Sequence, residues 1–165
     1  KGKQPVEVLN KLIEMLKDPE QRVVSITDVL IENNIDSLQD IYEKIYQSEK
    51  DLDWQRSSLK YLSTFPKQKH KEIFLEILEN PKSDFFAKSD ASMGLANLKD
   101  ESSVDLIIKV CEEESAHSDY NARIFLIALS KIKGEKARKY IEKYKNSKEK
   151  FIQDFVKELL ADWDN

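Results

Sequence analysis

The feature that most constrains the fold of this chain is a two-residue pattern that returns about every 33 residues. In each copy a leucine follows a small or hydrophobic residue. If the residue six positions before each pair is taken as position zero of a repeat, the zeros are separated by 32, 33, 34 and 31 residues. Such a period predicts stacked repeats, since each unit is too small to bury its own apolar face. The zero positions are Val23, Gln55, Lys88, Ala122 and Gln153, and the pairs are Val29-Leu30, Tyr61-Leu62, Gly94-Leu95, Ala128-Leu129 and Leu159-Leu160.

A second apolar pattern follows 19 and 22 positions after each zero. These two positions are three residues apart, so they lie on one face of a helix. Each repeat is therefore predicted to contain two helices. The side chains at these positions are Tyr42, Ile45, Phe74, Ile77, Ile107, Val110, Ile141 and Tyr144.

Composition supports a helical fold. Among 165 residues there are three glycines and four prolines, fewer turn residues than a β-sandwich or barrel normally needs. The 40% hydrophobic share is enough for a core, and the 35% charged share suits helices with one wet face each. We predict an all-α fold with ten helices, near residues 6–17, 19–33, 37–48, 52–65, 67–79, 84–98, 101–114, 119–132, 135–145 and 148–163.

The segment from Ala87 to Val110 carries a family resemblance. Small residues fill its first helix, Gly94-Leu95 and the turn Lys99-Asp100 follow, and Val104 opens the next helix. This segment resembles the bilin-lyase (phycobilisome lyase) subclass of HEAT repeats. The resemblance covers about residues 19–163 and implies a right-handed α–α superhelix, an armadillo-like solenoid of about four HEAT-like repeats.

We expect one repeat domain over residues 1–165. The pair Asp18-Pro19, with Gln21 three residues after the aspartate, predicts the start of a helix because it combines an N-cap, a proline at the first turn and a capping box. The expected parts are a capping helix at 6–17, repeats near 19–50, 51–82, 83–116 and 117–147, and a half-repeat at 148–163.

The residues that could support catalysis do not form a known motif. HEAT-like deoxyhypusine hydroxylases hold iron on paired His-Glu steps, whereas here His70 and His117 are followed by other residue types. We interpret both as surface histidines and predict no metal and no cofactor. Cys111 precedes three glutamates, which disfavour a reactive thiolate, so it is predicted to be a packed structural thiol. The chain is accordingly expected not to be an enzyme.

Two enzyme alternatives follow from HEAT-like relatives. Some HEAT-like DNA glycosylases hold a damaged base against Trp and Asp side chains, and Asp53-Trp54 invites that comparison. We prefer the interpretation that Trp54 packs in the core, because it lies beside a repeat zero.

The second alternative is a bilin-lyase type of chromophore attachment. The chain matches only the repeat unit of those lyases, and the repeat is a scaffold rather than a site.

Charge is unevenly distributed, although the net charge is only −4. Residues 131–150 contain nine Lys or Arg against three Glu, giving +6, and residues 100–119 contain seven Asp or Glu against one Lys, giving −6. The basic block could bind nucleic acid through its phosphates. We prefer the interpretation that the opposite charges of the two blocks neutralise each other. The blocks belong to second helices of adjacent repeats, and these helices lie side by side in a stack.

The predicted partner surface is the solvent-facing side of the second helices, at positions 17 and 21 of each repeat. The alternative interpretation is that these charged side chains only form i,i+4 pairs, which stabilise their own helices. Aromatic residues at the start of two first helices are possible anchors for a partner. The surface residues are Asp40, Lys44, Glu72, Glu76, Asp105, Lys109, Lys139 and Lys143, and the possible anchors are Phe85, Phe86 and Tyr120.

The expected function is therefore protein–protein interaction or scaffolding, with another protein or a peptide as the partner. Repeat stacks present long surfaces that suit such partners better than small substrates. No apolar run approaches the roughly 20 residues of a membrane span. A single cysteine fits a reducing compartment and predicts a cytoplasmic location.

Overall fold

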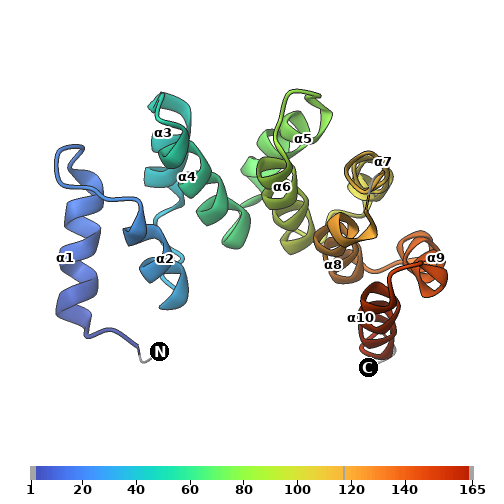
Figure 1. Ribbon diagram of the computed structural model, residues 1–165. Coiled ribbons are helices and arrows are strands. Elements are labelled where there is room, and N and C mark those ends of the chain that lie inside the picture. Colours follow the sequence, from blue (N-terminus) through green and yellow to red (C-terminus); the bar gives the residue numbers. More distant parts are fainter. Residues whose placement is uncertain (1–2, 117, 164–165) are drawn as a thin grey trace. The chain divides into compact units, whose positions relative to one another are not determined.

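The computed structural model describes residues 3–116 and 118–163, and in this part the chain forms helices and no strand (Figure 1). The predicted all-α class is thereby confirmed. The chain divides into two compact units, of which unit 1 ends at Phe65 and unit 2 begins at Pro66. Within the described residues, no helix combines the length and the apolar character needed to cross a membrane.

In its described residues, unit 1 contains four α-helices, α1 (Val6–Lys17), α2 (Ser25–Glu32), α3 (Gln39–Ser48) and α4 (Leu52–Thr64). Helix α4 packs against both α2 and α3, and α1 packs against α2. The start of α4 is fixed by Asp51, whose carboxylate accepts hydrogen bonds from the backbone N–H groups of Asp53 at 2.9 Å and Trp54 at 3.2 Å. This aspartate cap satisfies two of the donors that a helix start leaves open.

The core of unit 1 is built around two stacked tyrosines. The rings of Tyr42 and Tyr61 are fully buried, with centroids 3.9 Å apart. Tyr42 donates its hydroxyl proton to Thr27 at 3.0 Å, while the Tyr61 hydroxyl donates to the carbonyl of Ile35 and accepts from the N–H of Leu38 at 3.2 Å. These bonds satisfy polar atoms that would otherwise be costly to bury.

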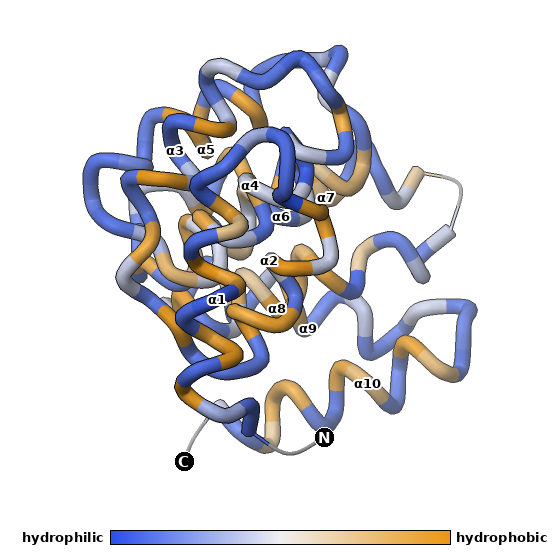
Figure 2. Tube along the Cα trace, turned by 90° about the vertical axis from the view of Figure 1, so that its left-hand side faces the viewer, coloured by the Kyte–Doolittle hydropathy of each residue, from blue (hydrophilic) through white to orange (hydrophobic). Residues whose placement is uncertain are grey.

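Over residues 66–116 and 118–163, unit 2 contains six α-helices arranged in two layers. One layer holds α6 (Phe85–Asn97), α8 (Arg123–Ile132) and α10 (Lys150–Ala161), and the other holds α5 (Lys71–Glu79), α7 (Val104–Glu114) and α9 (Glu135–Lys143). Neighbours in chain order pack across the layers. Hydrophobic and hydrophilic residues alternate along α10 (Figure 2), as expected for a helix with one buried face.

Short 3-10 turns precede three helices of unit 2 and follow a fourth. They change the predicted helices at 67–79, 101–114 and 119–132, whose first residues form a tight turn before the α-helix begins. The turns are η1 (Gln68–His70) before α5, η2 (Glu101–Ser103) before α7, η3 (Asp119–Ala122) before α8 and η4 (Tyr144–Asn146) after α9.

Two contacts tie α6 to its neighbours in unit 2. Gly94 leaves room for the buried ring of Phe74 on α5, because a Cβ at this glycine would lie 2.6 Å from two ring carbons. Lys88 is 5% exposed, and its ammonium lies 2.6 Å from a carboxylate oxygen of Glu114 at the end of α7. Gly94, at position 6 of this repeat, is therefore required for close packing of α6 against α5.

The predicted helix at 19–33 is wrong in its first turn. Helix α2 begins at Ser25, and Asp18 instead closes a turn by accepting from the N–H of Glu20 at 3.0 Å and the side-chain amide of Gln21 at 2.6 Å. The Asp-Pro pair starts a turn as readily as it caps a helix. In this turn Arg22 is positioned to form an ion pair with Glu49 at the end of α3.

Candidate functional site

The charged positions predicted as a partner surface are exposed in both units. Six of them lie in unit 2, two on each helix of the α5, α7 and α9 layer. We call these six residues the charged row. Its members are Glu72 and Glu76 on α5, Asp105 and Lys109 on α7, and Lys139 and Lys143 on α9.

The middle of the charged row is largely neutralised. Asp105 forms an ion pair with Lys136 of α9, and Lys109 lies 3.9 Å from Glu113 within α7. Lys139 is 2.6 Å from Glu135 one turn earlier in α9. All these groups are well exposed, so each pair contributes little to stability.

The two ends of the charged row are different. In the part of the chain that the structure describes, Glu72 and Glu76 form no ion pair. At the other end, the Lys143 ammonium lies 4.9 Å from the ring centre of Tyr140. The row therefore runs from uncompensated acidic charge on α5 to basic charge on α9.

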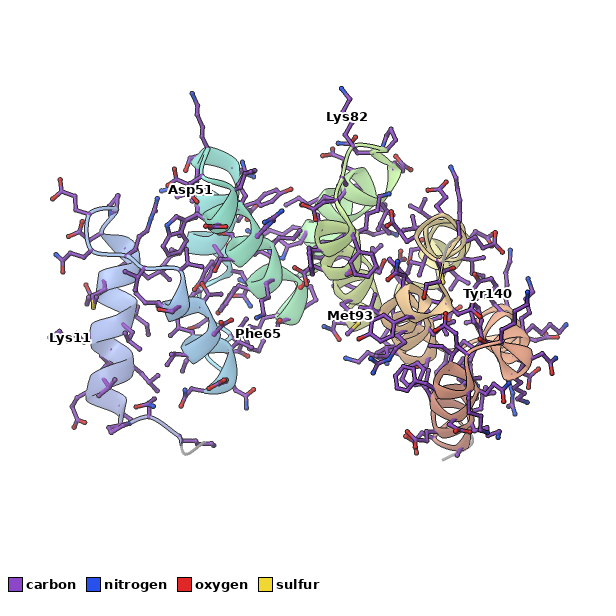
Figure 3. All side chains as sticks on the ribbon, viewed as in Figure 1. Lys11, Asp51, Phe65, Lys82, Met93 and Tyr140 are labelled. Carbon is purple, nitrogen blue, oxygen red and sulfur yellow. The ribbon has the colours of Figure 1, made fainter. Side chains whose placement is uncertain are left out.

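An open pocket of about 580 Å³ lies beside the basic end of the row. Tyr140 and Lys143 of α9 line it together with Tyr144 of η4, with Glu112 of α7 and with Ser115, which directly follows α7. Figure 3 labels Tyr140 on α9. We call this feature the tyrosine pocket.

The floor of the tyrosine pocket is a network of neutral groups. The hydroxyl oxygens of Tyr140 and Tyr144 are 3.3 Å apart, and the Tyr144 hydroxyl lies 3.4 Å from Ser115 Oγ and 3.7 Å from Cys111 Sγ. Burial raises the pKa of Tyr144 to about 12 and raises the pKa of the Cys111 thiol. Cys111 is fully buried, as predicted, and these groups stay protonated near neutral pH.

Polar side chains close the far rim of the tyrosine pocket. Glu149 accepts hydrogen bonds from the Ser118 hydroxyl at 2.9 Å and from the backbone N–H of Asp119 at 3.0 Å. The Ser147 hydroxyl donates to Asp119 in turn. These bonds join the segment before α8 to the segment before α10, so the rim serves to hold the two chain segments together.

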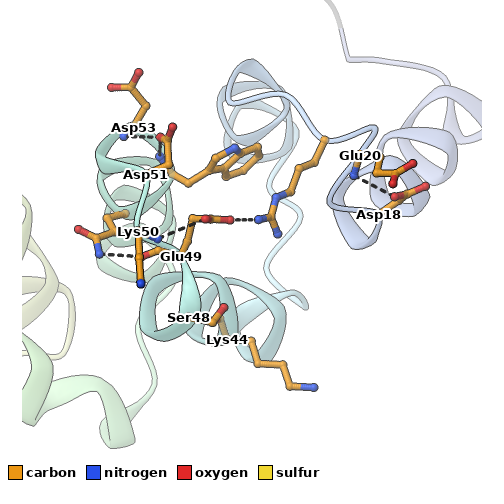
Figure 4. A network of polar contacts seen from close by, with 11 residues as sticks. Asp18, Glu20, Lys44, Ser48, Glu49, Lys50, Asp51 and Asp53 are labelled. Atoms are coloured by element: carbon orange, nitrogen blue, oxygen red, sulfur yellow. Dashed lines mark hydrogen bonds and ion pairs between the residues drawn. The ribbon is translucent and has the colours of Figure 1, made fainter.

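In unit 1, the predicted surface residues Asp40 and Lys44 line an open pocket of about 540 Å³ together with Arg22. Arg22 is held from two sides, because its guanidinium pairs with Glu49 and lies 5.0 Å from the centre of the Trp54 ring. Figure 4 shows this polar network in close-up, with Glu49 and Lys44 labelled.

The Asp53-Trp54 pair does not form an open base-binding site in this structure. Trp54 is 9% exposed, and Arg22 lies over its ring. Asp53 is exposed, and its backbone N–H donates a hydrogen bond to the Asp51 carboxylate that caps α4. Packing, the preferred interpretation for this tryptophan, accounts for its position.

The predicted aromatic anchors separate into two kinds. Phe85 is half-buried and packs edge-on against Phe125, with ring centres 5.9 Å apart, whereas Phe86 is 67% exposed. Tyr120 is 56% exposed and stacks on Phe151 at 6.0 Å. Sequence reasoning missed Phe151, although the repeat register contains the clue, since Phe86, Tyr120 and Phe151 all lie two residues before a repeat zero.

The basic and acidic blocks meet between α7 and α9, where Lys136 pairs with Asp105. Much of the remaining compensation is local. Arg138 and Lys145 lie 3.7 and 3.4 Å from Glu142, and Lys150 lies 2.9 Å from Asp154. The basic block is therefore less available to phosphates than its charge of +6 suggests.

The interpretation of His70 as a surface residue is wrong. Its side chain is fully buried, and Nδ1 accepts a hydrogen bond from the backbone N–H of Lys67 at 3.0 Å. The histidine thereby closes the 3-10 turn before α5. His117 lies outside the described residues. Within the described residues, no group of three His, Cys, Asp or Glu side chains is arranged to hold a metal ion.

Comparison with known proteins gives no further identification: no family model matches this sequence, and no curated protein shows significant similarity to it.

Proposed function

We propose that this chain is a non-catalytic protein-interaction module in which HEAT-like repeats wind into a right-handed superhelix. The two alternating layers of unit 2 support this proposal, because stacked two-helix repeats place first helices in one layer and second helices in the other. The regular spacing of the repeat zeros supports extending the arrangement to the earlier repeats.

The charged row is the surface that we propose contacts the partner. The observation that carries the proposal is that its six residues stay exposed on three neighbouring helices, with charge changing from acidic on α5 to basic on α9. A partner whose charge runs in the opposite order would be attracted and aligned by this surface. An extended peptide or a helix of another protein fits such a row better than a compact small molecule does.

The tyrosine pocket supports binding rather than chemistry. The Tyr144 hydroxyl and the neighbouring Cys111 thiol, which does not line the pocket, are kept protonated by burial, so they can donate and accept hydrogen bonds but are poor nucleophiles and bases. Because Lys143 belongs both to the row and to the pocket, we propose that one side chain of the bound partner enters the pocket. The module needs no cofactor for this role.

The proposal is tested by capture of partners from native cell extract with charge-reversal variants. One variant carries Glu72→Lys and Glu76→Lys, and another carries Lys139→Glu and Lys143→Glu. The control carries Lys82→Glu and Lys157→Glu at exposed lysines outside the row, and it changes the net charge by the same amount as the second row variant. Figure 3 shows Lys82 pointing away from the ribbon.

A partner protein that survives nuclease treatment, binds the control and is lost from both row variants is the expected result. Nucleic acid captured alone, and released as salt is raised, would instead identify the basic block at 131–150 as the working surface. A protein that binds both row variants as well as the control would show that the row is not the contact surface.

A further inference from the structure

A second surface of unit 2 carries exposed aromatic rings at one repeated position. Phe86, Tyr120 and Phe151 are 67%, 56% and 49% exposed, and each begins or precedes a helix of the α6, α8 and α10 layer. The corresponding positions of unit 1 hold Gln21 and Asp53. Since the core of unit 2 is filled by other side chains, these rings remain in contact with solvent, where large aromatic side chains commonly mark binding surfaces.

Arg123 lies among these rings at the start of α8. Its guanidinium carbon is 4.8 Å from the ring centre of Phe151, 5.0 Å from that of Phe155 and 5.6 Å from that of Tyr120. Cation–π attraction to three rings holds the guanidinium in place. We call Tyr120, Arg123, Phe151 and Phe155 the aromatic cluster.

The charge of Arg123 has no acidic partner among the described residues, and its buried Nε has no hydrogen-bond partner there. Acidic groups of the segments that carry the aromatic cluster are already engaged, and the Asp119 carboxylate accepts from Ser147. Asp154 lies 2.9 Å from Lys150 and 3.4 Å from Lys157, and Glu149 accepts from Ser118 and from the Asp119 backbone. The aromatic cluster therefore carries one uncompensated positive charge.

That single charge selects the class of ligand. A guanidinium binds a carboxylate through charge-assisted hydrogen bonds, and one carboxylate matches one positive charge. A phosphate group carries close to two negative charges and is usually recognised by several arginines. The exposed faces of Tyr120 and Phe151 add an apolar surface beside the charge, which a free inorganic anion would leave unused.

We propose that the aromatic cluster binds an acidic peptide segment of a partner protein. An Asp or Glu carboxylate of the segment contacts Arg123, and a neighbouring apolar side chain packs on the rings of Tyr120 and Phe151. This site lies on the layer of α8 and α10, so it is distinct from the charged row on α5, α7 and α9. Its existence does not depend on the function proposed for that row.

The test uses the intact chain and a displayed library of short random peptides. The enriched peptides are expected to carry Asp or Glu next to an aromatic or aliphatic residue. Synthetic peptides are then titrated against the chain by calorimetry. Replacing the acidic residue by its amide, or introducing Arg123→Gln or Phe151→Ala, is expected to weaken binding about tenfold. Changing the peptide alone leaves the fold of the chain untouched.

Matched variants distinguish binding at this site from nonspecific binding and from binding at the charged row. Phe86→Ala removes a more exposed ring that lies outside the cluster, and Arg56→Gln removes an exposed arginine of unit 1. The row variant with Glu72→Lys and Glu76→Lys tests the other surface. All three are expected to bind the peptides with unchanged affinity, even where the row variant loses its own partner.

Three outcomes would overturn the proposal. The first is a library that yields no enriched peptide, or peptides without acidic residues. The second is equal affinity of the enriched peptides for the parent chain and Arg123→Gln. The third is displacement of the peptides by inorganic phosphate at concentrations where acetate has no effect, which would assign the site to a phosphorylated ligand.

Discussion

The two units fill the same repeat positions with different chemistry. In unit 1, Tyr42 and Tyr61 stack face to face, and their hydroxyls bond to Thr27, Ile35 and Leu38. In unit 2, the ring of Phe74 lies against Gly94 and forms no such bond. One polar element of the unit 2 interior is instead the ion pair of Lys88 and Glu114.

This difference shows that a repeat register specifies which positions are inside but not how they are stabilised. A tyrosine core requires partners for each hydroxyl, whereas a glycine–phenylalanine contact requires only complementary shape. The two units are therefore expected to respond to different substitutions. Fluorescence of Trp54 in a Trp163→Phe variant and of Trp163 in a Trp54→Phe variant allows the unfolding of the two units to be followed separately.

The largest effect is expected from breaking the ion pair of unit 2. Glu114→Ala leaves the buried Lys88 ammonium without its carboxylate and should lower the free energy of unfolding by about 3–5 kcal/mol. Lys88→Met removes the buried charge itself and should be nearly neutral. Urea unfolding of both variants checks this prediction, and equal losses in the two variants would contradict it.

Filling the space at Gly94 should be the next most damaging change. In Gly94→Leu the new side chain meets the buried Phe74 ring, and overpacking of this kind should cost about 3 kcal/mol. Adding Phe74→Ala should recover part of the loss, because the two changes share one space. Thermal unfolding of the single and double variants measures this coupling, and strict additivity would show that the contact is not limiting.

In unit 1 the corresponding test removes hydroxyl groups. Tyr61→Phe leaves the Leu38 N–H and the Ile35 carbonyl unpaired and should cost about 2 kcal/mol. Tyr42→Phe should cost about 1 kcal/mol, because Thr27 keeps its bond to Ser57 at 2.6 Å. Hydrogen exchange should become faster at the Leu38 amide in Tyr61→Phe but not in Tyr42→Phe. Unchanged protection of that amide in Tyr61→Phe would exclude the proposed role of the hydroxyl.

The smallest expected effect is an acid-dependent contribution in unit 2. Burial of the Asp100 carboxyl favours its protonated form, but hydrogen bonds from Lys71 at 2.9 Å and Ser102 at 2.9 Å outweigh burial and hold its pKa below 3.8. The stabilisation is therefore complete above pH 3.8 and is lost as pH falls through the lower pKa of the folded state.

Lys71→Met should remove part of this acid dependence and cost about 0.5 kcal/mol at neutral pH, as expected for a partly exposed pair. Unfolding free energies compared at neutral pH and below pH 3.8 provide the measurement. A variant that loses stability on acidification as steeply as the parent chain would show that the pair contributes nothing.

Much of the helix order was predictable because the apolar periodicity of each helix is local. The first turn of 19–33 was mispredicted because an Asp-Pro pair suits a turn as well as a helix start, and the side chain of Arg22 pairs with the distant Glu49. His70 was mispredicted for a similar reason. A histidine followed by a lysine looks exposed in sequence, whereas in the fold its ring closes a turn and is covered.

The all-α class, the burial of the five register leucines and the exposure of the charged row follow from the sequence alone, because helix periodicity places each side chain inward or outward. Only the tertiary structure decided which groups meet. The Lys88–Glu114 pair, the tyrosine pocket and the enclosure of Arg123 by three rings all join residues of different helices. Such contacts depend on the distance and orientation between helices, which are set by the packing of side chains far apart in the chain.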